Sequence, residues 1–247
     1  MGEAEARAPK STPRLIGETF RLYRRYPLLF LILAAGVVVP YRLIVLAATG
    51  AGPLNQGELA GGIALLLTLV DTAVVNPLVS ALHVRAVEEV EEGRTPQLGP
   101  VARRGLTVLP VVAAAVIMSW LAFFGGLLLL VLPGIYVFFR LSVTAQTAAI
   151  EHQGWWPALK RSWALTEGNL LHVIFFIIGV AVITALPGLL IDRVLADETT
   201  VVSFVGGVAV QVVVISFDAL ATAVLYFDLR ARRRHAAEEF LEISTRS

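Results

Sequence analysis

Six long apolar stretches, separated by short polar connections, fill almost the whole chain between Pro27 and Phe227. A segment of about 20 apolar residues is long enough to cross a bilayer as a helix. The sequence therefore predicts an all-α fold, a polytopic transmembrane helix bundle. Little of the chain remains outside these stretches to form a soluble catalytic domain.

Composition supports a membrane protein and excludes several kinds of chemistry. Hydrophobic residues make up 57% of the chain, above the roughly 45–50% of an ordinary globular protein, and the mean hydropathy is +0.76. There is no cysteine, which excludes disulfides, thiolate nucleophiles and thiolate metal ligands. A formal net charge of +1 gives no overall attraction to nucleic acid, so no nucleic-acid partner is expected.

The apolar stretches predict six membrane spans. These are residues 27–48, 61–82, 106–128, 135–150, 170–191 and 201–227. They form a six-helix integral membrane domain over residues 14–234. A flexible cytoplasmic tail is expected at residues 1–13 and a second cytoplasmic tail at residues 235–247.

The distribution of cations predicts the orientation. Of the 20 lysine and arginine residues, 17 lie in the termini and in alternate connections, Arg193 lies in a connection on the other side, and Arg42 and Arg140 lie within spans. Cytoplasmic loops carry the excess of lysine and arginine, so both termini are expected in the cytoplasm, in agreement with six crossings. Abundant Ala, Val and Gly with little lysine is typical of a high-GC bacterium, which predicts a multi-pass protein of the bacterial cytoplasmic membrane.

Two segments that precede spans have the pattern of amphipathic helices. Apolar and aromatic side chains recur at helical spacing in residues 15–27 and again in residues 154–169. Such helices lie in the headgroup plane, with their rings at the boundary and their cations toward anionic lipid. The expected contacts with anionic headgroups on the cytoplasmic side are Arg24, Arg25, Lys160, Arg161, Arg232 and Arg233.

Four sequence blocks carry a family resemblance. They are LIGETFRLYRRYPLLF, LPGIYVFFRLSVTAQTAAIE, WPALKRSWALTEGN and LYFDLRARR. In order and spacing they resemble the membrane domain of the glycerophosphoryl diester phosphodiesterase membrane-domain family, in its stand-alone form. The resemblance implies a six-helix membrane module whose biochemical role is poorly defined. Because only about twenty residues follow the last predicted span, the metal-binding phosphodiesterase barrel of the fusion proteins is not expected here, nor is its activity.

Polar residues within the predicted spans form the candidate intramembrane site, which comprises Asp71, Asn76, Arg140 and Asp218. A charged side chain near the bilayer centre costs about 2.5–3.5 kcal/mol on insertion scales, so Arg140 is expected inside the bundle. Asp71 is its expected partner, and Pro77 predicts a kink in the second span. Each charge has two open interpretations, a structural pair or a contact with a transported or bound ion.

The sequence contains no arrangement that indicates catalysis or metal binding. HxxxH, HExxH, G-x-S-x-G, P-loop and dinucleotide-binding motifs are absent, so no catalytic residue, metal or cofactor is expected. Glu151 and His152 are the one adjacent pair that a lipid enzyme would need near the interface. The leading hypothesis is a non-enzymatic membrane protein that organises partner proteins or lipids. The alternative is a small transporter or channel that uses Asp71, Arg140 and Asp218.

Overall fold

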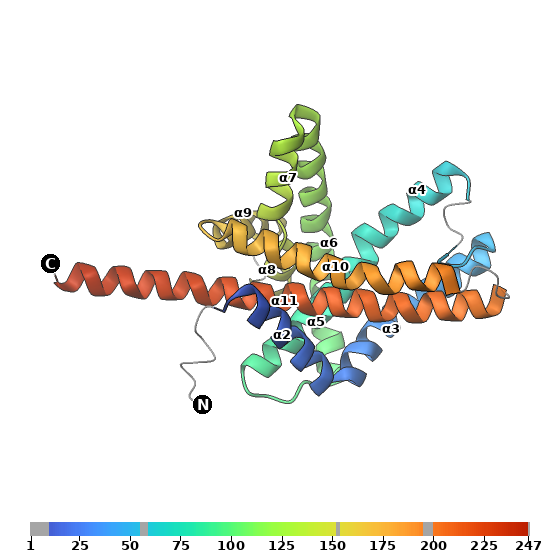
Figure 1. The fold of residues 1–247 in the computed structure, drawn as a ribbon, viewed down its shortest axis with the longest axis horizontal. Coiled ribbons are helices and arrows are strands. Elements are labelled where there is room, and N and C mark those ends of the chain that lie inside the picture. The colour runs from blue at the N-terminus through green and yellow to red at the C-terminus, as the bar shows by residue number, and fades with distance from the viewer. Residues whose placement is uncertain (1–9, 55–58, 152–153, 195–199, 247) are drawn as a thin grey trace.

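A computed structural model describes residues 10–54, 59–151, 154–194 and 200–246, and within these ranges the chain is helical without any strand. Figure 1 shows the arrangement. The elements are α2 (Thr12–Arg25), α3 (Pro27–Thr49), α4 (Gly61–Val70), the π-helical turn η2 (Asp71–Val75), α5 (Asn76–Glu91), α6 (Leu98–Leu129), α7 (Val131–Arg140), α8 (Thr144–Glu151), α9 (Trp155–Thr166), α10 (Leu170–Val194) and α11 (Thr200–Arg246).

Five helices in the described part of the chain are long and apolar enough to cross a membrane, as expected for a multi-pass membrane protein. They are Pro27–Thr49, Gly61–Glu91, Leu98–Leu129, Leu170–Ile191 and Val201–Glu238. Most of the apolar part of the first four helices lies outside the buried core, whereas just over half of that of Val201–Glu238 is buried inside the bundle. The prediction of apolar helices is confirmed for five of the six stretches.

The stretch 135–150 does not form the continuous helix that was predicted for it. Instead α7 ends at Arg140 and α8 begins at Thr144. Polar side chains explain the break, because the Thr144 hydroxyl donates to the Leu141 carbonyl at 2.8 Å, and such local bonds compete with helical hydrogen bonding. In addition, the hydroxyls of Ser162 and Thr166 on α9 donate to the Arg140 carbonyl, which satisfies this acceptor at the end of α7.

Both predicted amphipathic segments are separate helices, α2 and α9. The buried face of α2 consists of Leu15, Thr19 and Leu22. It lies beside the stripe of Ile16, Phe20 and Tyr23 that recurs at helical spacing in the sequence. Phe20 itself is 43% exposed, although its ring lies 4.8 Å from that of Phe217 on α11. The two helices therefore lie on the surface of the bundle and attach to it by a narrow apolar face.

The face of α9 that packs on the bundle shares only Leu159 with the stripe of Trp155, Leu159 and Trp163 that recurs at helical spacing in the sequence. Ala158, Leu159 and Leu165 are buried, whereas Trp155 and Trp163 are exposed. Exposed tryptophans beside cations are typical of the membrane–water interface, where the ring is partly in hydrocarbon and its N–H reaches water.

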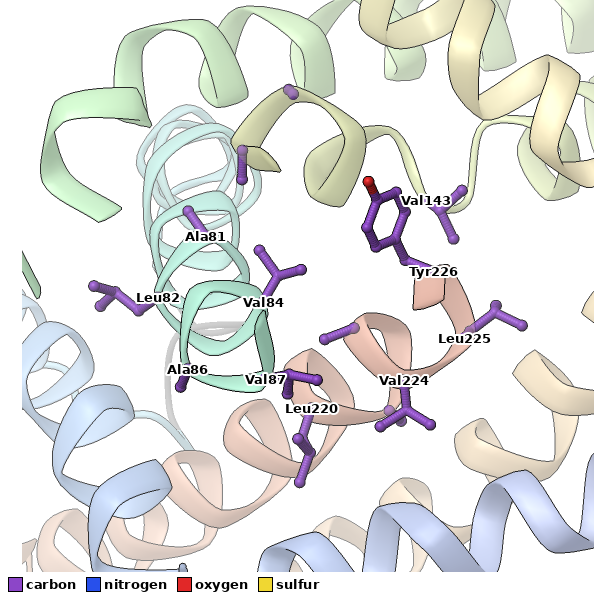
Figure 2. Close-up of a cluster of buried hydrophobic side chains, with 14 of the residues drawn as sticks. Ala81, Leu82, Val84, Ala86, Val87, Val143, Leu220, Val224, Leu225 and Tyr226 are labelled. Carbon is purple, nitrogen blue, oxygen red and sulfur yellow. The ribbon is translucent and has the colours of Figure 1, made fainter. Parts of the chain in front are cut away.

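The core forms where α5 packs against α11, with α8 closing one side. Figure 2 shows Val84 and Val87 of α5 in the same buried cluster as Leu220 and Val224 of α11. Alanines on both helices are fully buried at this contact, and small side chains allow two helices in a membrane to approach closely. The contact therefore relies on backbone proximity and van der Waals packing.

α11 is a long helix with an apolar first part and a charged C-terminal part. Its 47 residues make it about 70 Å long at 1.5 Å per residue. α3 and α10 contact the apolar part of α11, and Figure 1 shows its C-terminal end extending beyond them. The predicted tail at 235–247 continues this helix up to Arg246.

α6 and α7 form a helical hairpin with a very close contact near its tip. A Cβ atom on Gly126 would lie 2.8 Å from the Gly134 Cα, whereas a Cβ atom on Gly125 would have no neighbour within 4 Å. We expect Gly126→Ala to destabilise the protein by about 1–3 kcal/mol, because the added methyl overpacks the contact. Thermal unfolding in detergent micelles measures this. The neighbouring Gly125→Ala variant is the control, and equal stability of the two variants would contradict the prediction.

Candidate functional site

A buried ion pair joins α3 to η2 within the apolar helices. The Arg42 Nη2 lies 3.1 Å from Asp71 Oδ2 and 3.2 Å from Oδ1, and the Arg42 Nε donates to the Gln211 Oε1 of α11 at 2.7 Å. The Arg42 side chain is 6% exposed and that of Asp71 19%. One guanidinium thus connects three helices.

The backbone near Asp71 departs from a regular α-helix. Residues Asp71–Val75 form a π-helical turn in which the Asn76 N–H donates to the Asp71 carbonyl. Pro77 has no N–H to donate and follows directly in α5, and a helix with an interior proline must rearrange its hydrogen bonds. A π-turn that begins at the paired carboxylate therefore precedes Pro77, in the span where the proline predicts a kink.

Arg140 lies away from Asp71, so the predicted pair between them is not formed. Arg140 is 7% exposed, its Nη1 donates to the Trp163 carbonyl at 3.3 Å, and its guanidinium lies 4.7 Å from the Trp163 ring and 5.2 Å from the Tyr136 ring. The faces of aromatic rings attract a cation. Arg140 consequently fixes the end of α7 to α9 and stands at the level of the surface helix.

The other two residues of the candidate intramembrane site are on the outside of the bundle. Asn76 and Asp218 are both exposed, in contrast to Arg42 and Asp71. The structure thus brings none of the four candidates Asp71, Asn76, Arg140 and Asp218 into one site. The partner of Asp71 is instead Arg42, whose guanidinium also binds Gln211.

The six predicted headgroup contacts divide into two groups. Arg24, Arg25 and Lys160 are exposed. The Arg25 guanidinium lies 5.3 Å from the Tyr26 ring and the Lys160 Nζ lies 5.2 Å from the Trp156 ring. A cation beside an exposed aromatic ring suits the headgroup region, where the ring faces hydrocarbon and the charge faces phosphate.

The other three cations make contacts within the protein. The Arg161 Nε donates to Glu151 Oε1 at 2.9 Å, the Arg232 Nε donates to Asp228 Oδ2 at 2.7 Å, and the Arg233 Nε donates to the Ala164 carbonyl at 2.8 Å. Ala164 lies in the last turn of α9, where carbonyls lack helical partners and a cation is favoured. Arg161, Arg232 and Arg233 therefore hold surface helices in place.

Asp228 is the centre of a polar network that was not predicted from the sequence. Its side chain is 1% exposed, and it accepts hydrogen bonds from the Lys10 backbone N–H at 2.8 Å and from Arg232. The His172 Nε2 lies 3.2 Å from Asp228 Oδ2. The network joins the segment before α2, the start of α10 and the middle of α11. The one feature of the sequence that could have indicated this network is the i,i+4 spacing of Asp228 and Arg232 at the end of the last apolar stretch.

A cavity of about 610 Å³ lies beside this network, between α2, the end of α5 and the charged part of α11. Its wall contains both signs of charge, and the Lys10 Nζ lies 2.7 Å from Glu18 Oε2 within it. The charged lining residues are Lys10, Glu18, Glu88, Glu91, Glu92, Asp228, Arg230, Arg234 and Glu238, together with His235. The cavity therefore lies at the end of the bundle where the N-terminal segment meets the charged part of α11.

Two of the described histidines, His83 and His172, lie in structural surroundings, whereas His235 is exposed. His83 is fully buried, with Nε2 3.0 Å from the Ser216 hydroxyl and its ring stacked on Phe30. His152 lies outside the described residues, and its neighbour Glu151 binds Arg161 and the Tyr226 hydroxyl. Within the described ranges no three His, Cys, Asp or Glu side chains are placed to hold a metal ion.

No family model, curated protein or solved structure matches the chain. The arrangement of its own residues is therefore the basis for a function. Two features stand out in that arrangement: a buried ion pair that links helices within the bundle, and exposed cations with aromatic rings on the surface helices.

Proposed function

We propose that this chain is a non-enzymatic integral membrane protein that organises partner proteins or lipids at the cytoplasmic face of the bacterial cytoplasmic membrane. The observation that carries the proposal is the contrast between the two kinds of charge. Arg42 binds both Asp71 and Gln211 between the apolar helices, whereas Arg24, Arg25 and Lys160 are exposed on α2 and α9. The buried charge stabilises the bundle, and the exposed charge is available to anionic lipid.

Both termini lie in the cytoplasm under this proposal. The support is the distribution of cations, since 17 of 20 lysine and arginine residues fall on one side of the apolar stretches. An even number of crossings is then required. Six crossings and four crossings both satisfy this requirement, and they differ only in the path of α6 and α7.

The resemblance to the membrane domain of the glycerophosphoryl diester phosphodiesterase membrane-domain family agrees with this role, because it implies a six-helix membrane module. The transporter alternative, by contrast, needs intramembrane charges along one path. Asp71 lies at the α3–η2 contact, Arg140 lies beside α9, and Asp218 is exposed. This separation favours the organising role.

Lipid retention tests the proposal. We expect a variant with Arg24→Gln, Arg25→Gln and Lys160→Gln to lose bound anionic lipid, by roughly fivefold in affinity for each charge, because a cation near the surface contributes about 1 kcal/mol. Native mass spectrometry from mixed anionic and zwitterionic membranes measures the retained lipid. The Arg161→Gln variant is the control, since Arg161 binds Glu151. Unchanged anionic lipid retention in the triple variant would contradict lipid organisation by these cations.

A further inference from the structure

The α6–α7 hairpin stands apart from the rest of the bundle, as Figure 1 shows. Buried positions along α6 continue only up to Ala115 and resume at Gly126, which faces α7. The first half of α6 therefore packs on the body of the protein, where α6 contacts α5, α8 and α9. The half beyond Ala115 has α7 as its neighbour and projects outward.

The tip of this hairpin is the most exposed apolar surface of the described chain. Leu128 is 90% exposed, and Leu129 and Leu132 are each 79% exposed. Residues 126–135 read GLLLLVLPGI, without one polar side chain. Two other connections lie, like this tip, on the side of the apolar stretches that has few cations, but they are polar. Residues 50–60 include Asn55, Gln56 and Glu58, and residues 192–199 include Asp192, Arg193, Asp197 and Glu198. A turn with the composition of the α6–α7 tip is suited to hydrocarbon.

The length of α7 limits how far the hairpin reaches. α7 has 10 residues, which span about 15 Å, half of the roughly 30 Å thickness of a bilayer core. Its C-terminal end is fixed, because the Arg140 carbonyl accepts hydrogen bonds from Ser162 at 3.0 Å and Thr166 at 3.2 Å. The tip is therefore at most half a bilayer core away from α9.

α9 marks the depth of that fixed end. Lys160 and Trp156 are exposed side by side on α9, and tryptophans and cations together gather at the membrane–water interface. The orientation in the proposed function puts this interface on the cytoplasmic side. The base of α7 then lies at the cytoplasmic headgroups. Figure 1 shows the hairpin projecting crosswise to α10 and α11 rather than along them, so its tip stays within the cytoplasmic half of the bilayer.

We propose that the α6–α7 hairpin is re-entrant: it enters the membrane from the cytoplasmic face and turns back within the hydrocarbon. Its partner is the acyl chains of the cytoplasmic leaflet, which cover the leucines of the tip. The chain then crosses the membrane four times, through α3, the α4–η2–α5 helix, α10 and α11, and both termini stay on one side. The direction of entry rests on the proposed orientation. The failure to cross rests on the shortness of α7, which limits the reach of the hairpin although α6 alone is long enough to cross, and on the apolar composition of the tip.

Single-cysteine labelling tests this inference directly, because the natural chain contains no cysteine. Leu130→Cys reports on the tip of the hairpin. Ala60→Cys reports on the exposed residue directly before α4, and Thr95→Cys reports on the exposed connection between α5 and α6. Each full-length variant is treated with a membrane-impermeant maleimide in intact cells, in inverted vesicles and after detergent solubilisation. Leu128→Cys and Leu132→Cys serve as second tip variants if the first is not produced.

We expect Ala60→Cys to react in intact cells, Thr95→Cys to react in inverted vesicles, and the tip variants to react only after solubilisation, with at least a tenfold difference in labelling. Reaction of the tip variants in intact cells would show a crossing hairpin and overturn the inference. Reaction of the tip variants in inverted vesicles would place the hairpin outside the membrane and also overturn it. An exchange of sides between Ala60→Cys and Thr95→Cys would overturn the orientation, and with it the cytoplasmic entry.

Discussion

Asp71→Ala is expected to destabilise the protein by about 3–5 kcal/mol, because it leaves a buried guanidinium without its counter-ion. Arg42 is 5% exposed, so its charge has little access to water. Its remaining hydrogen bond, from Nε to Gln211, does not neutralise the charge. Thermal unfolding in detergent micelles, together with the yield of folded protein, measures the loss.

Asn76→Ala is the matched control for this substitution. Asn76 lies at the start of α5, just after the turn that begins at Asp71, but is exposed, and substitutions of exposed residues usually change stability by less than about 0.5 kcal/mol. A transport role for Asp71 predicts a different outcome, in which Asp71→Asn folds normally and abolishes solute flux in proteoliposomes. An Asp71→Ala variant as stable as the Asn76→Ala variant would contradict a structural role for the ion pair.

Asp228→Ala is expected to have the next largest effect, a destabilisation of about 2–3 kcal/mol. The substitution removes the acceptor for the Lys10 N–H and for Arg232, and a buried donor without a partner costs about 1–3 kcal/mol. The loss is smaller than at Asp71 because the Arg232 and His172 side chains are 20% and 13% exposed and can turn toward water. Thermal unfolding measures the total loss of stability.

The same substitution has a local signature. Since Asp228 joins the segment before α2 to α10 and α11, amide hydrogen exchange should accelerate in residues 10–16 of the Asp228→Ala variant. Glu167→Ala is the control, because the Glu167 side chain is 64% exposed where it meets Arg233, and exposed ion pairs contribute about 0–1 kcal/mol. Unchanged exchange in residues 10–16 would argue against the role of Asp228 as the anchor of α2.

Much of the helix content could be predicted from the sequence, because long apolar stretches and amphipathic surface segments have clear patterns. α3, α10 and the surface helices α2 and α9 follow the predicted segments closely. The fourth predicted span differed because hydropathy does not register hydrogen bonds between helices. The hydroxyls of Ser162 and Thr166 bind the Arg140 carbonyl, so α7 ends where a continuous helix was expected.

The candidate site was predicted less well, because the pairing of charges depends on how neighbouring helices are aligned along one another. Depth along the chain favoured Arg140 as the partner of Asp71, whereas the packing of α3 beside η2 selects Arg42. α11 contributes Gln211 as a second partner of the same guanidinium. Asp228 was missed for a related reason. Its partners Lys10 and His172 are 218 and 56 residues away in the chain, and no local pattern reveals such contacts.

A double-mutant cycle at the buried ion pair tests the central claim that the charge between the apolar helices is structural. The account predicts that Arg42→Met combined with Asp71→Leu has a stability near that of the natural protein, because a hydrophobic pair of similar volume can replace a buried ion pair without loss. The double variant should also retain anionic lipid like the natural protein. Loss of stability in the double variant equal to the sum of the two single losses would contradict the claim, since it would mean that Arg42 and Asp71 do not stabilise each other.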